Sequence, residues 1–93
     1  MLYTFVVEFR GGTYIHQINA RAVRSALRTW MNELVERRIV LPHLGPVAVK
    51  RLRERFGMGE VHEVPILGVA NVWFVHFPSK QGSLFGNVVR TAP

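Results

Sequence analysis

Apolar and polar residues alternate along two stretches near the start of the chain, residues 2–10 and 13–19. Both stretches are rich in Tyr, Phe, Val, Ile and Thr, a pattern typical of β-strands. Gly11 and Gly12 lie between them and permit the positive φ angles of a type I′ or II′ turn. The pattern therefore predicts a hairpin with Phe9 opposite Tyr14, Val7 opposite His16 and Phe5 opposite Ile18.

The two faces of this hairpin differ in character. One face is apolar and aromatic and is expected to be core; it carries Tyr3, Phe5, Val7, Phe9, Tyr14, His16 and Ile18. The other face is mixed and too apolar for a purely solvated surface; it carries Leu2, Thr4, Val6, Glu8, Thr13, Ile15 and Gln17.

The spacing then changes to that of a helix, which we predict over about 20–38 with Asn19 as its N-cap. Its buried face would hold Val23, Ala26, Leu27, Trp30, Met31 and Leu34. Arg21 and Arg24 would lie in its first turns, where the helix dipole disfavours cations. Stability alone does not favour arginine there, although solvated arginines are also common on helices.

A shorter second helix is predicted from Pro46 to Gly57, followed by a loop with a short extended piece at 61–64. Residues 71–77 and 83–91 form a second predicted hairpin, with Gly86 at a bulge. The predicted fold is a single α+β domain over residues 1–93. It has a four-stranded antiparallel sheet in ββααββ order, with both helices packed on one face.

The first strand of the second hairpin is apolar on both faces, with Trp73, Val75 and Phe77 on one side and Val72 and Phe74 on the other, which is typical of a strand buried on both sides. If the helices cover one face of the sheet, the other needs a partner, often a second copy of the chain. The expected contacts are Val6 and Ile15 with either Trp73 and Val75 or Val72 and Phe74, whichever pair faces away from the helices. A homodimer or protein-interaction module is one of two hypotheses.

The other hypothesis comes from the charge of +6, which belongs to the middle of the chain. Residues 21–55 hold nine of the twelve basic residues against three Glu, and the remainder of the chain is balanced. Clustered cations bind phosphates by paired hydrogen bonds and counterion release. A nucleic acid or another polyanion would be contacted by Arg21, Arg24, Arg28, Lys50, Arg51, Arg53 and Arg55. This hypothesis requires the basic residues of both helices to lie on one continuous surface.

Candidate chemistry is sparse. The chain has no cysteine and no Asp, and its serines lack the motif of a nucleophile. His16, His43, His62 and His76 lack the spacing that brings imidazoles together on a metal. We therefore expect no enzyme activity, no cofactor and no metal, and the sequence identifies no small-molecule substrate. Without a long apolar run or a signal-type N-terminus, a cytoplasmic location is expected, with no membrane association.

The stretch YTFVVEFRGGTYIHQINARAVRSALRTW, about a third of the chain, resembles the opening of small bacterial α+β proteins, a resemblance that implies no activity. Its order of strand, Gly-Gly-x-Tyr turn, strand and helix, with Ala26 and Leu27 on the buried helix face, is also similar to the N-terminal part of HicB-type antitoxins. That resemblance implies a partner-binding, often oligomeric and sometimes DNA-binding protein. It assigns no functional residue here.

Overall fold

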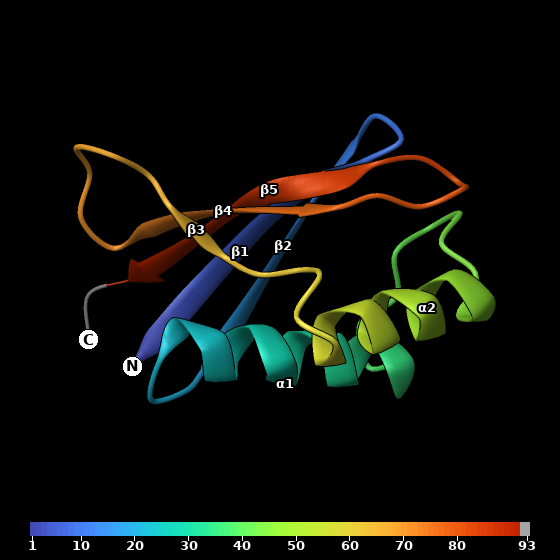
Figure 1. The fold of residues 1–93 in the computed structure, drawn as a ribbon, viewed down its shortest axis with the longest axis horizontal. Helices are drawn as coiled ribbons and strands as arrows, with labels where there is room; N and C mark the ends of the chain where they lie inside the picture. Colours follow the sequence, from blue (N-terminus) through green and yellow to red (C-terminus); the bar gives the residue numbers. More distant parts are fainter. Residues whose placement is uncertain (92–93) are drawn as a thin grey trace.

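The sheet and the helices form two layers in a computed structural model, which describes residues 1–91. In chain order the elements are β1 (Leu2–Phe9), β2 (Gly12–Asn19), α1 (Val23–Val35), α2 (Pro46–Gly57), β3 (Val64–Pro65), β4 (Val72–Phe77) and β5 (Leu84–Thr91). Both helices lie on the same side of the sheet (Figure 1). The α+β class and the one-sided placement of the helices are as predicted.

The sheet has five strands, in the order β2-β1-β5-β4-β3, and every neighbouring pair is antiparallel. The prediction of four strands was therefore wrong. The additional strand is β3, in which Val64 pairs with Phe74 and Pro65 with Trp73. The sequence indicated only a short extended piece ending at Val64. A strand of two residues that includes a proline has no alternation to detect, and its pairing depends on where β4 lies.

The first hairpin turns one residue earlier than predicted, at Arg10 and Gly11, which both have positive φ (49° and 81°). Phe9 consequently pairs with Gly12, and Val7 pairs with Tyr14. The predicted partners were wrong by two residues. Because side chains alternate with a period of two, this shift leaves every residue on its predicted face.

The core lies between the sheet and α1, with α2 completing it at one end. Trp30 is fully buried and stacks between Phe5, at 5.3 Å between ring centroids, and Phe77, at 5.7 Å. On the first hairpin Tyr3, Phe5, Val7, Phe9 and Ile18 are buried as predicted, and Tyr14 and His16 are partly buried. On α1 the residues buried are Ala26, Leu27, Trp30, Met31 and Leu34.

Two further local predictions were wrong. Helix α1 begins at Val23 with Ala22 at its N-cap, because Asn19 is used as the last residue of β2. No bulge occurs at Gly86, which pairs in unbroken register with Val7 and Val75. Glycine is required there by close strand approach, because an added Cβ would lie 2.7 Å from the Cα of Val7.

Candidate functional site

The seven basic residues predicted to bind a polyanion all lie on the helical side of the molecule, but they do not form one free surface. Arg24, Arg53 and Arg55 are partly buried and bonded within the protein, whereas Arg21, Arg28, Lys50 and Arg51 are exposed.

Arg24 and Arg53 hold the two helices together around the ring of Phe56. The guanidinium of Arg24, on α1, lies 4.2 Å from the centroid of this α2 ring and donates a hydrogen bond of 3.2 Å to Glu63. From α2, Arg53 lies 5.6 Å from the same ring, and its Nε donates to Oδ1 of Asn32 on α1 at 2.8 Å. These contacts give both arginines a structural role.

Arg55 lies on the side of α2 away from α1 and contacts the loop after α2 and the β4–β5 turn. Its Nε pairs with Glu60 at 3.1 Å, and its Nη1 donates to the carbonyl of Pro78, before the β4–β5 turn, at 3.2 Å. Arg51 lines the same cleft between α2 and this turn, together with Lys80. The basic residues of α2 are thus divided between a side toward α1 and a side toward the β4–β5 turn.

Four of the predicted cations remain available to a partner. Within residues 1–91, Arg21, Arg28, Lys50 and Arg51 take part in no ion pair and donate no side-chain hydrogen bond. Arg21 precedes α1, Arg28 lies in the middle of that helix, and the other two lie on α2. They are spread over the helical side of the molecule.

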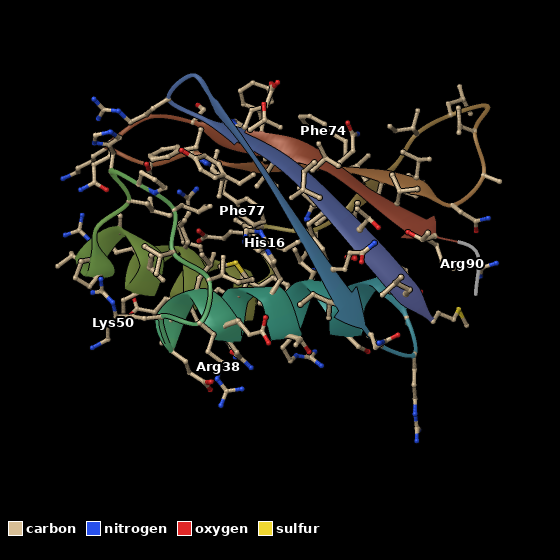
Figure 2. The ribbon with its side chains drawn as sticks, turned by 180° about the vertical axis from the view of Figure 1, so that it is seen from behind. His16, Arg38, Lys50, Phe74, Phe77 and Arg90 are labelled. Atoms are coloured by element: carbon tan, nitrogen blue, oxygen red, sulfur yellow. The ribbon has the colours of Figure 1, made fainter. Side chains whose placement is uncertain are left out.

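The sheet face turned away from the helices, here called the open face, carries apolar side chains on each of its five strands. Of the two alternative pairs, Val72 and Phe74 lie on it, and Trp73 and Val75 face the helices. One row runs across five strands as Ile15, Val6, Asn87, Phe74 and Val64. The structure thus brings the four predicted interface residues Val6, Ile15, Val72 and Phe74 onto one face. Figure 2 shows Phe74 on this face and Phe77 between sheet and helices.

Two residues of the open face were not predicted to belong to it. Phe85, on β5, is 40% exposed, as is Phe74, and Val64 on β3 is 48% exposed. Phe85 pairs with His76 of β4 and Glu8 of β1, so it extends the apolar surface by one row. Its position could have been found from alternation with the buried Leu84, whereas Val64 depended on the unpredicted strand β3.

The histidines of the described residues form no cluster that could bind a metal ion. Within residues 1–91 no three His, Asp or Glu side chains lie close enough to hold a metal ion. His16 is partly buried beneath the helical layer, and burial lowers its pKa below the usual 6.5, opposed by the negative charge of Glu33. Its Nδ1 has no hydrogen-bond partner within the described structure. His16 is thus a neutral packing residue at pH 7.

Neither helix of residues 1–91 has the length and apolar character needed to cross a membrane. Comparison of the chain with protein-family models, with curated proteins and with solved structures finds no match. The similarity of the N-terminal third to HicB-type antitoxins therefore stays a prediction.

Proposed function

We propose that the protein is a non-catalytic binding module that works as a homodimer, in which two copies pair through the open faces of their sheets. The observation that carries this proposal is the set of exposed apolar side chains spread over the strands of that face. Ile15 is 63% exposed, and Phe74 and Phe85 are each 40% exposed. Large apolar side chains exposed together on one face are typical of an interaction site.

The distribution of charge favours a second copy as the occupant. Glu8 is the one Glu, Lys or Arg side chain on the open face within the described strands, where His76 also lies, and the surplus of Lys and Arg lies on the helical side. Two copies that meet sheet to sheet keep their cationic helices pointing outward, so like-charge repulsion is small. A strongly charged partner would find no complementary charge there.

The size of the open face is also compatible with a dimer. Five strands spaced by about 4.8 Å, with residues rising about 3.3 Å each, give a face on the order of 20 by 25 Å. Side-chain relief makes the accessible area larger than this projection, near the roughly 800 Å² per partner of standard interfaces. Two such sheets pack about 10 Å apart with their side chains interdigitated.

Light scattering coupled to size exclusion tests the proposal, using wild-type protein and Phe74→Lys. The wild type should have twice the monomer mass, and the variant should be monomeric with an unchanged circular dichroism spectrum. A twofold interface receives each substitution twice, so we expect the dissociation constant to rise by roughly a hundredfold or more. Val47→Lys is the matched control, because Val47 is an exposed apolar residue (65%) on α2.

A monomeric wild type at all accessible concentrations would refute the dimer. A Phe74→Lys variant that remains dimeric would place the interface elsewhere, for example along β2, which is an edge strand of eight residues.

The exposed cations support a second candidate function, binding of a nucleic acid or another polyanion on the outward helical faces. Arg28 and Arg51 are the informative positions, because they are exposed and make no internal bond in the described structure. Fluorescence anisotropy with labelled single- and double-stranded DNA and RNA should show binding that weakens steeply with salt. Arg28→Glu with Arg51→Glu should abolish it. Absence of binding at low salt would exclude this function.

A further inference from the structure

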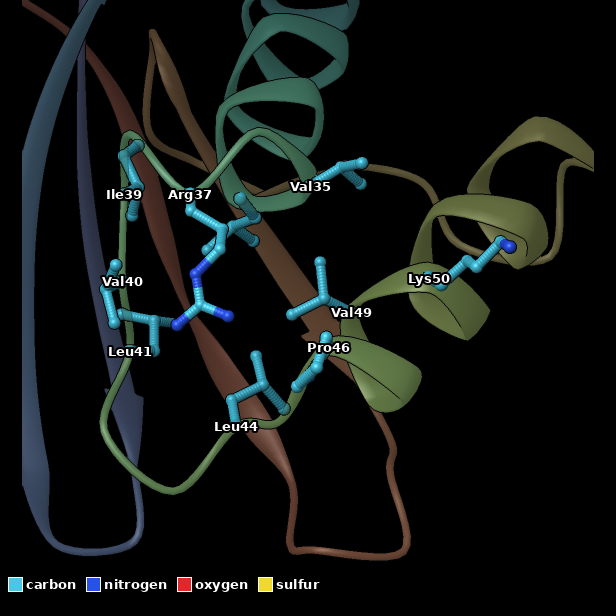
Figure 3. A pocket seen from close by; sticks show the side chains of 10 residues that line it. Val35, Arg37, Ile39, Val40, Leu41, Leu44, Pro46, Val49 and Lys50 are labelled. Atoms are coloured by element: carbon cyan, nitrogen blue, oxygen red, sulfur yellow. The ribbon is translucent and has the colours of Figure 1, made fainter.

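An apolar hollow lies where the end of α1, the connection between the helices and the start of α2 meet (Figure 3). Its volume is about 320 Å³, which is within the lower range of small-molecule sites. The walls are formed by Leu34 at the end of α1, Leu41 and Leu44 of the connection, and Val49 on α2. These side chains are 2–9% exposed, so the walls belong to the packed core.

One cation reaches over the hollow. The backbone of Arg37 is left-handed, with φ of 62°, and Figure 3 shows its side chain extending between Leu41 on one side and Pro46 and Val49 on the other. Within residues 1–91 this guanidinium has no ion pair and donates no hydrogen bond. Lys50 also lines the hollow, but its ammonium group is directed away from it.

The lining contains no acidic residue that could neutralise this cation. The nearest acid in sequence, Glu36, pairs with Arg38 at 3.3 Å. A planar guanidinium offers paired donors that match a carboxylate. An apolar cavity with one free guanidinium at its mouth is therefore complementary to a molecule with a hydrocarbon body and one anionic end.

We infer that this hollow binds a small amphipathic carboxylate, with an aromatic or branched hydrocarbon body in the cavity and the carboxylate on Arg37. A neutral ligand of the same shape would cover the guanidinium without satisfying its donors. A cationic ligand would be repelled. The site shares no residue with the open face, so it does not depend on the proposed dimer. Of its lining residues, Lys50 is among the cations considered for polyanion binding, but Arg37 is not.

Titration of the 93-residue protein with 4-phenylbutyrate, followed by amide chemical shifts in nuclear magnetic resonance, tests this inference. Saturable shifts should be confined to residues 34–50. The matched alcohol 4-phenylbutanol should bind at least tenfold more weakly, because it lacks the charge. Arg37→Gln should reduce the affinity for the carboxylate at least tenfold. Arg38→Gln, which removes an adjacent exposed arginine that does not line the hollow, should leave the affinity unchanged.

Arg37→Gly is a second variant that keeps the test valid if glutamine disturbs the connection, because glycine adopts a positive φ without strain. It should weaken binding as much as Arg37→Gln does. The inference is overturned if no saturable binding occurs at millimolar carboxylate, if the shifts fall on the strands of the open face, or if the alcohol binds as tightly as the acid. Unchanged affinity in both Arg37 variants would also overturn it.

Discussion

Replacing Arg24 by methionine should lower the free energy of unfolding by about 2 kcal/mol. The substitution keeps a long unbranched side chain of similar helix propensity and removes the guanidinium. That group is held by the ring of Phe56, the carboxylate of Glu63 and the carbonyl of Val61. A partly buried cation–π contact contributes about 1 kcal/mol. The Arg24 side chain is 37% exposed, so solvent screens its ion pair with Glu63. Together, the ion pair and the hydrogen bonds contribute about 1 kcal/mol more to stability.

Urea denaturation followed by tryptophan fluorescence, to which the buried Trp30 and the partly buried Trp73 contribute, measures this loss. In a thermal scan the same change corresponds to a decrease in melting temperature of about 10 °C for a domain of this size. Arg28→Met is the control, because Arg28 lies one turn further along α1, is exposed and has no partner in the described structure. It should change stability by less than about 0.5 kcal/mol. Equal effects of the two substitutions would refute the structural role of Arg24.

Gly86→Ala should destabilise the protein by about 3 kcal/mol, because its methyl group would push β5 away from Val7 of β1. Urea denaturation should show no comparable loss for Gly57→Ala, whose added Cβ meets one side-chain atom at 3.4 Å. Acidification should also destabilise the fold, because burial holds the pKa of His16 below 6.5 against the opposing charge of Glu33. The unfolded chain then binds more protons below pH 6.5, so stability falls as pH decreases. His16→Gln should flatten this slope in denaturation curves measured between pH 7.5 and 5; an unchanged slope would contradict the assignment.

The two faces of the sheet were predictable, whereas the exact strand pairing was not. Alternation places Val6 and Ile15 together on one face whether the turn begins at Arg10 or at Gly11, since moving the turn by one residue changes each pairing by two. The choice between these turns depended on Arg10 adopting a positive φ, which is uncommon for a residue other than glycine. Face assignments are therefore more robust than register.

The roles of the arginines could not be predicted, because charge is visible in the sequence and its partners are not. Arg24 pairs with Glu63, which is 39 residues away, and Arg55 reaches the carbonyl of Pro78, 23 residues away. In the sequence both arginines belong to one basic segment with an unexplained surplus of charge. In the folded protein Glu63 pairs with Arg24 and Glu60 pairs with Arg55, so two cations of that segment are neutralised by glutamates outside it.

Because Arg24 and Arg55 are paired with glutamates, substitutions that test nucleic-acid binding should be made at other basic residues. A charge reversal at Arg24 combined with one at Arg28 would remove a contact between α1 and the loop after α2, so lost binding could reflect lost structure. Substitutions at Arg28 and Arg51 alter the same helical side without breaking a bond seen in the described structure. If these variants keep native stability and still bind nucleic acid as the wild type does, phosphate contact by these two residues is refuted. If binding is lost at native stability, the surplus charge on the helices has a function beyond folding.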